Sequence, residues 1–130
     1  MLLAHGFLAK ILEAFARHRV VVDLVSTSEV SVSCTVDREE GLDAALHELR
    51  SIGEVSVTHG RTLVCVVASG LPRHGALCAK IFATLEDERI AVELVSMGAS
   101  AINVSVVVDD AAGEQAVRAL HRALFTRSAR

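Results

Sequence analysis

The chain has 130 residues, of which 52% are hydrophobic and 3% aromatic, and its formal net charge is −3. This length suffices for one compact domain or for two small ones. Because Trp and Tyr are absent, the core must consist of Val, Leu, Ile and Ala, which favours sheets with helices packed on them. The 13 Lys and Arg residues are scattered along the chain, so no nucleic acid is expected as a partner.

The first half of the chain opens with a strand, a helix and two more strands. Residues 1–4 are expected to form the first strand. A helix is predicted from Phe7 to His18, because apolar residues recur there at helical spacing; they are Leu8, Ile11, Leu12 and Phe15. Residues 20–27 are largely β-branched and apolar, and residues 30–36 alternate apolar with polar side chains, which is typical of a half-buried strand.

A second helix and a short strand complete this half. Asp37 and Glu40 have the spacing of a capping box at the start of a helix. Apolar residues at helical spacing then follow and stop before Gly53; they are Leu42, Ala45, Leu46 and Leu49. Glu54 to Thr58 is the expected closing strand. The order β-α-β-β-α-β over residues 1–60 is that of a ferredoxin-like α+β module.

The second half, residues 61–130, predicts the same order without its last strand. Strands are expected at 62–68, 90–96 and 102–108, the third alternating, and Pro72 and Gly75 mark the start of the first helix. The two predicted helical stripes consist of Cys78, Ile81, Phe82 and Leu85, and of Val117, Leu120, His121 and Leu124. Only five polar or small residues follow Phe125. We therefore expect the second module to lack one strand within this chain.

The two halves also share sequence, which identifies an internal repeat. Residues 5–11 (HGFLAKI) resemble 74–81 (HGALCAKI), with one residue inserted. Residues 20–26 (VVVDLVS) correspond to 90–96 (IAVELVS), and 32–37 (VSCTVD) correspond to 104–109 (VSVVVD). The chain is therefore expected to contain two copies of one module, in residues 1–60 and 61–130.

Several segments resemble the tandem ACT regulatory region at the C-terminal end of lysine-sensitive aspartate kinases. In the first copy they are Gly6 to Ala9, Ala16 to His18, Val22 to Leu24 and Thr27 to Ser33; in the second they are Gly98 to Ser105 and Leu120 to Phe125. The resemblance implies an allosteric sensor without catalytic activity or cofactor. It also implies a separate catalytic kinase domain, in a monofunctional enzyme or in a fusion such as one with diaminopimelate decarboxylase.

The resemblance further implies that lysine binds between the first modules of two chains in a homodimer. The helix start at Gly6, Phe7 and Leu8 is expected to hold the lysine carboxylate. Asp23 is expected to receive the ε-ammonium group. Other site residues implied by the resemblance are Met1, which lines the pocket, and Ser28, Glu29 and Val30, which lie where the partner closes it. Leu3, Ala4 and Val21 stand where well-known lysine-sensitive members carry polar residues.

The same residues bear on other functions. A threonine-sensing pair, as in kinases fused to homoserine dehydrogenase, leaves Asp23 without a counter-charge, and a generic small-molecule-binding ACT module is a further alternative. An RNA-binding module needs aromatic residues on its central strands, which this sequence lacks. The sequence shows neither clustered metal ligands nor a set of nucleophile and base. The three cysteines (Cys34, Cys65, Cys78) lack CxxC spacing, so we expect buried thiols. Neither a signal peptide nor an apolar run of ~18 residues is present. We therefore expect no membrane partner and a cytoplasmic protein.

Overall fold

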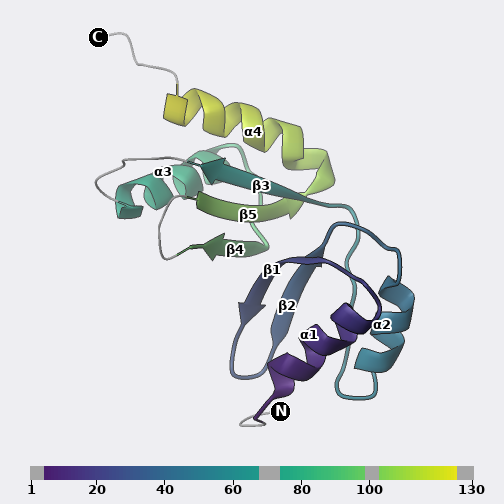
Figure 1. Cartoon of the computed structure of the whole chain (residues 1–130). Coiled ribbons are helices and arrows are strands. Elements are labelled where there is room, and N and C mark those ends of the chain that lie inside the picture. The colour runs from purple at the N-terminus through teal and green to yellow at the C-terminus, as the bar shows by residue number, and fades with distance from the viewer. Residues whose placement is uncertain (1–4, 68–73, 99–102, 126–130) are drawn as a thin grey trace, which may run out of the picture. The chain divides into compact units, whose positions relative to one another are not determined.

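The computed structural model describes residues 5–67, 74–98 and 103–125. The chain forms two compact units, Met1–Val57 and Thr58–Arg130. Figure 1 shows that each contains helices and a small antiparallel sheet. The structure does not describe residues 1–4, 68–73 and 99–102. The predictions for Met1, Leu3, Ala4 and Pro72 therefore lie outside the described residues. The predicted ferredoxin-like α+β class is confirmed by this mixture of helices and antiparallel strands.

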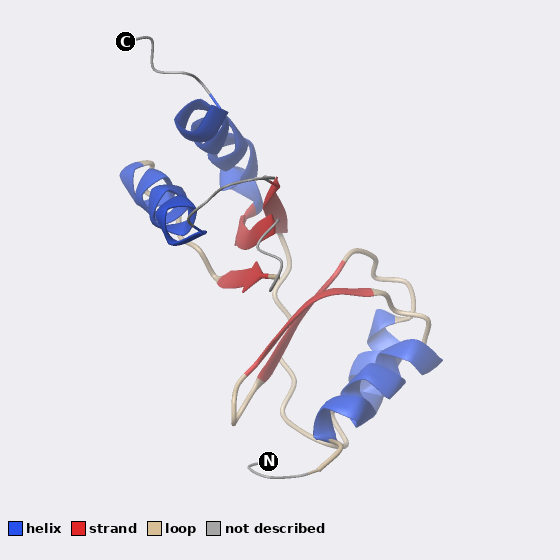
Figure 2. Ribbon diagram, turned by 60° about the vertical axis from the view of Figure 1, so that its left-hand side comes forward, coloured by secondary structure: helices blue, strands red, loops and turns tan. Residues whose placement is uncertain are grey.

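The first unit contains helices α1 (Phe7–Arg17) and α2 (Leu42–Leu49) and strands β1 (Val22–Thr27) and β2 (Val32–Val36). The antiparallel β1 and β2 form a two-stranded sheet, and both helices lie on one side of it (Figure 2). Three β2 side chains that pack against the buried core lie on this helix-covered face; they are Val32, Cys34 and Val36. The buried core residues come from both helices and from Val20, two residues before β1; they are Ile11, Ala14, Phe15, Val20, Leu42, Ala45, Leu46 and Leu49.

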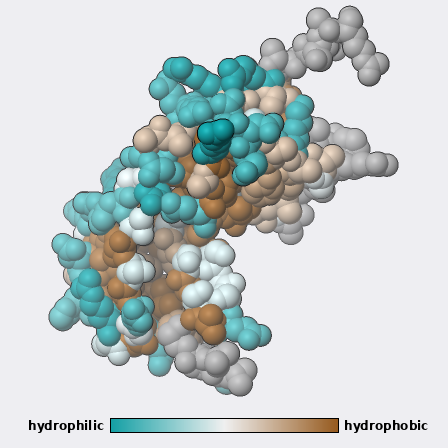
Figure 3. Space-filling model, turned by 180° about the vertical axis from the view of Figure 1, so that it is seen from behind, coloured by the Kyte–Doolittle hydropathy of each residue, from teal (hydrophilic) through white to brown (hydrophobic). Residues whose placement is uncertain are grey.

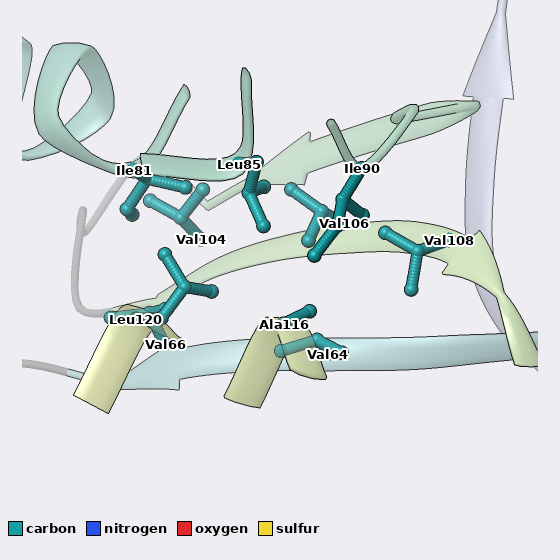
Figure 4. Packing of buried hydrophobic residues seen from close by; sticks show 10 residues of the cluster. All are labelled: Val64, Val66, Ile81, Leu85, Ile90, Val104, Val106, Val108, Ala116 and Leu120. Carbon is teal, nitrogen blue, oxygen red and sulfur yellow. The ribbon is translucent and has the colours of Figure 1, made fainter. Parts of the chain in front are cut away.

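The second unit contains β3 (Arg61–Val67), α3 (His74–Asp87), β4 (Leu94–Met97), β5 (Asn103–Asp109) and α4 (Asp110–Phe125). The strand order is β3-β5-β4, with both neighbours antiparallel to β5. Figure 4 shows the buried side chains of α3 and α4 meeting those of β3 and β5. They are Val64, Val66, Ile81, Leu85, Ile90, Val104, Val106, Val108, Ala116 and Leu120. Helices and sheet thus share one core within this unit.

The repeat extends to the way in which α1 and α3 end. Arg19 (φ 60°) and Arg89 (φ 57°) adopt the left-handed conformation. The next N–H groups then reach back into the helix, from Val20 to Phe15 O at 2.9 Å and from Ile90 to Leu85 O at 2.8 Å. This is the Schellman arrangement, which satisfies terminal helix carbonyls. The apolar residue after each arginine is buried, so both copies stop the helix and turn the chain into the core in the same way.

Several expectations about element ends are wrong. Glu54 to Thr58 is not a strand. The predicted capping box is also wrong, because α2 starts at Leu42 after Gly41 (φ 78°) and has no side-chain cap. Strand β4 begins at Leu94 instead of 90. Strands β1 and β2 begin two residues later than expected, at Val22 and Val32.

Burial also differs from the expected pattern. Strand β5 does not alternate, because Val104 to Val108 are all buried. As the central strand, β5 has neighbours on both sides, so its side chains opposite the helices are covered by those of β3 and β4. Cys65, expected to be buried, is exposed, and Cys34 and Cys78 are only half-buried.

The apolar stripes of the helices are narrower than expected. Ile11 and Phe15 are buried, whereas Leu8 and Leu12 remain 38% and 40% exposed. In α3, Phe82 is likewise 38% exposed. In α4 the predicted Val117 and His121 are exposed, and small residues pack instead; they are Gly113, Ala116 and Ala119. Gly113 approaches Thr62 so closely that an added Cβ would lie 2.9 Å from Thr62 Cγ2, so the helix packs through its small residues.

Candidate functional site

The first turn of α1 presents uncapped backbone N–H groups. Gly6 precedes the helix in the left-handed conformation, with φ 79° and ψ 6°, and no side chain caps the turn. The Gly6 carbonyl accepts the Lys10 N–H at 3.0 Å, and the first turn contains no acidic residue. Phe7 packs against the core and Leu8 is 38% exposed. A helix start of this kind attracts an anionic group such as a carboxylate.

Asp23 lies at a β-bulge near the start of β1. The register passes from Val22↔Val36 to Val25↔Cys34, so Asp23 and Leu24 together oppose Thr35. The Leu24 N–H donates to Thr35 Oγ1 at 3.0 Å. Because Val36 and Cys34 pack on the helix side, their register assigns Asp23 to the opposite, helix-free face, where it is exposed. Among the described residues the Asp23 carboxylate has neither an ion pair nor a hydrogen bond.

The turn between β1 and β2 is organised by Ser28. Its Oγ accepts the N–H groups of Val30 at 3.3 Å and Ser31 at 3.1 Å, and lies 2.8 Å from Ser31 Oγ. Its N–H donates to Ser31 O at 2.8 Å. Glu29 is exposed, as is Val30 at 63%. Ser28 thus fixes the turn and leaves two side chains facing outward.

One chain brings together only part of the predicted site. Figure 1 shows α1 beginning at the end of the unit where the β1–β2 hairpin turns, so Gly6, Phe7 and Leu8 lie at the same end as the Ser28 turn. Asp23 lies five residues before Ser28 along β1, which corresponds to about 16 Å. Asp23 and the helix start therefore lie at opposite ends of the strand.

The equivalent acid of the second unit, Glu93, is paired. Arg61 Nε donates to Glu93 Oε2 at 2.7 Å, and Arg61 Nη1 lies 3.2 Å from Asp109 Oδ2. The hydrogen bond with Glu93, and then the nearby charges of Glu93, Asp109 and Asp110, raise the pKa of Arg61. Sequence reasoning assigned no role to Glu93 and missed Arg61. The signal was the pairing of the first and third strands of the module, which sets Arg61 opposite Asp109.

The remaining polar groups form no second site in the part of the chain that the structure describes. There, no group of three or more His, Cys, Asp or Glu side chains is placed to hold a metal. The free thiol of Cys34 has a raised pKa because it is partly buried, which disfavours the reactive thiolate. An open hollow on α4, lined by Val117, Arg118, His121 and Arg122, contains none of the predicted site residues.

Apolar side chains also reach the surface, as Figure 3 shows in brown among the hydrophilic residues of one face. The most exposed of them in the described ranges are Val21 (70%), Val30 (63%) and Val67 (61%). Singly exposed apolar residues of this kind are common on protein surfaces. No helix in these ranges is both long and apolar enough to cross a membrane.

Comparison with known proteins assigns a family to this arrangement. A family model described as the ACT domain matches residues 1–49 and 64–124, which is most of both units. The chain therefore belongs to the ACT domain family, and the predicted resemblance is confirmed. Its relatives are aspartate kinases. The similar solved structures show that it corresponds to their regulatory region.

Three similar proteins illustrate this. A structure described as a C-terminal regulatory domain of aspartate kinase from Porphyromonas gingivalis is 33% identical, has a TM-score of 0.81, and covers 93% of this chain and 81% of its own. Aspartokinase III of E. coli, solved with lysine and aspartate, is 33% identical with a TM-score of 0.76, over 97% of this chain and 29% of its own. The aspartokinase of Candida albicans is 37% identical over 95% of this chain. The chain spans about a quarter of the length of such curated relatives, since it covers 23% of the Candida protein.

Proposed function

We propose that this chain is the effector-sensing part of an aspartate kinase and that it binds lysine through its first unit, for feedback control of aspartate-family amino-acid synthesis. The observation that carries the proposal is the exposed carboxylate of Asp23, which has no partner among the described residues. An exposed acid without a partner offers a contact to a cationic ligand, and lysine provides an ε-ammonium group. The lysine in the E. coli aspartokinase III structure supports the same choice.

The backbone of α1 complements this acid. Lysine carries a carboxylate as well as an ammonium group, and the uncapped N–H groups of Phe7 and Leu8 suit the carboxylate. Binding at both ends selects an amino acid with a long cationic side chain. Threonine has only a neutral hydroxyl in its side chain and offers Asp23 no counter-charge.

The separation of these groups supports a site shared by two chains. Asp23 and the Ser28 turn are about 16 Å apart along β1, and α1, with 11 residues, spans about 16 Å as well. An extended lysine measures roughly 8 Å from its carboxylate carbon to Nζ by standard bond lengths. One lysine therefore does not bridge the two ends of one unit, whereas the helix start of one chain and Asp23 of another can meet around it.

The proposed homodimer uses the first unit. In this arrangement the outward side chains of Glu29 and Val30, presented by the Ser28 turn, close the pocket of the neighbouring chain. Met1 joins them as a lining residue. The catalytic kinase domain of the longer protein, in the cytoplasm, then receives the signal when lysine draws two chains together.

Calorimetry with lysine, threonine, methionine and S-adenosylmethionine tests the proposal. We expect lysine to bind and threonine to give no heat. Asp23→Asn should weaken lysine binding by about 10- to 150-fold, because a hydrogen bond to a charged group contributes roughly 1.5–3 kcal/mol. Asp43→Asn, which changes an exposed acid in the first turn of α2, is the matched control and should bind lysine normally. Heat from threonine alone, or unchanged affinity in Asp23→Asn, would contradict the proposal.

A further inference from the structure

The segment of β1 that carries Asp23 contains an extra residue. The register leaves Asp23 and Leu24 together opposite the single residue Thr35 of β2. A bulge of this kind disrupts the ladder of backbone hydrogen bonds and leaves the extra residue unpaired. The direction of the Asp23 carboxylate therefore depends on whatever else holds these two residues in place.

The side chain of Thr35 holds them. Its Oγ1 accepts the Leu24 N–H at 3.0 Å across the two strands. This N–H belongs to the peptide group that directly follows the Cα of Asp23, so the bond fixes the backbone beside the carboxylate. Thr35 is half-buried, whereas Asp23 is exposed. Because threonine is β-branched and restricted in χ1, its hydroxyl is a stiff anchor for this peptide.

The second unit forms the same bulge without a hydroxyl. Glu93 donates its N–H to Val107 O at 2.9 Å, and the next residue, Leu94, pairs with Val107, so both oppose one residue. Val107 stands where the repeat has Thr35, and its side chain accepts no hydrogen bond. The hydroxyl bond is therefore a feature of the unit that carries Asp23 and not of the module in general.

We propose that Thr35 is a positioning residue for the effector: its hydroxyl holds the bulge in the conformation in which the Asp23 carboxylate meets the cationic end of the ligand. This inference rests on the proposed function. A carboxylate whose backbone is fixed before binding loses less conformational freedom when the cation arrives. Thr35 then contributes to affinity through Asp23 without contacting the ligand.

The first test is the affinity for lysine, measured by calorimetry. Thr35→Val keeps the branched shape and removes the hydroxyl, so it should weaken lysine binding by about 2- to 12-fold, which corresponds to one neutral hydrogen bond. Thr35→Ser keeps the hydroxyl and should bind like wild type. Ser33→Ala, which removes an exposed hydroxyl from the same strand, is the control and should also bind normally. Unchanged affinity in Thr35→Val, or an equal loss in Thr35→Ser, would overturn the inference.

A double-mutant cycle shows whether Thr35 acts through Asp23. In the Asp23→Asn background, adding Thr35→Val should cause no further loss of affinity, because the carboxylate that the hydroxyl positions is already gone. A general effect on the fold would instead weaken binding by the same factor in both backgrounds. That result would also overturn the inference.

Hydrogen exchange of the Leu24 amide without lysine separates this inference from the proposed function. The amide should exchange faster in Thr35→Val than in wild type, and Thr35→Ser and Ser33→Ala should resemble wild type. If wild type binds no lysine while Leu24 responds in this way, the lysine proposal fails and Thr35 still holds the bulge. If Leu24 exchanges at the same rate in wild type and Thr35→Val, the hydroxyl does not hold this segment and the inference fails, whether or not lysine binds.

Discussion

At the scale of single residues, two glycines with nearly the same backbone conformation have different surroundings. Gly6 (φ 79°) has open space where a Cβ would lie, whereas a Cβ on Gly41 (φ 78°) would lie 2.2 Å from the carbonyl oxygen of His18. The left-handed conformation costs an L-residue about 1–2 kcal/mol. At Gly41 a backbone collision adds to that cost, because α2 starts directly beside the end of α1.

We predict that Gly41→Ala destabilises the first unit well beyond Gly6→Ala. Gly6→Ala should lower the free energy of unfolding by about 1–2 kcal/mol, whereas Gly41→Ala must also move the end of α1. Urea denaturation of the two variants measures the difference. Equal losses of stability would show that the end of α1 can move away from Gly41 without an additional cost in free energy.

The same scale shows what a sequence can reveal about a site. Asp23 could be predicted because an acid interrupts an apolar strand. Its bulge could not be predicted, because it depends on Leu24 bonding to the side chain of Thr35. Arg61 was missed because its contacts with Glu93 and Asp109 lie 32 and 48 residues away in the sequence, and strand register decides them.

At the scale of elements, α1 and α2 are linked through one carboxylate. Glu48 on α2 pairs with Arg17 and lies 3.0 Å from His18 Nε2. The hydrogen bond from Arg17, and then that from His18, lower the pKa of Glu48. A lowered pKa in the folded state stabilises the protein above the unfolded value of about 4.3, and this contribution disappears as the pH falls through the folded pKa.

We therefore predict that Glu48→Gln is less stable than wild type at pH 7 and that this difference shrinks as the pH falls below about 4. The physical reason is that the protonated Glu48 carboxyl and the glutamine amide that replaces it are both neutral, so acid removes the advantage of the wild-type carboxylate. Urea denaturation of both proteins between pH 7 and pH 3 measures the difference. A difference that stays constant over this range would rule out the carboxylate as the link.

The strand order sets which strands of the second unit are least protected. Strand β5 is central and has partners on both sides. In the described residues β3 and β4 each have β5 as a strand neighbour on one side only. Half of the N–H groups of an antiparallel edge strand point away from its partner.

We predict that alternate amides of Arg61 to Val67 exchange rapidly with solvent while those of Val104 to Val108 are uniformly protected. Hydrogen exchange followed by NMR resolves them residue by residue. Uniform slow exchange along β3 would contradict this prediction.

At the scale of elements the helices were more predictable than their ends. Helical spacing placed the four helices of the described residues because each buries a stripe of apolar residues. The start of α2 was missed because the left-handed Gly41 and the carbonyl of Glu39, which accepts the Leu42 N–H at 3.0 Å, replace the expected capping box. The packing face of α4 was missed because Gly113, Ala116 and Ala119 allow a closer approach than larger residues do.

At the scale of the whole molecule, the repeat was the strongest signal in the sequence. It predicted two modules, and the structure divides into two compact units, each with its own apolar core. The repeat could not reveal that Glu93 is ion-paired, because the arginine that pairs with it lies outside the matched segments.

If lysine binds between two copies of the first unit, the dissociation constant of the dimer must depend on the lysine concentration. A ligand that needs both chains stabilises the dimer by linkage, and about 2.7 kcal/mol is gained for each site at a lysine concentration 100 times its Kd. Sedimentation equilibrium should therefore show the dissociation constant falling steeply as lysine is added, with threonine having no effect. A dissociation constant that lysine leaves unchanged, or a chain that stays monomeric at saturating lysine, would contradict the account.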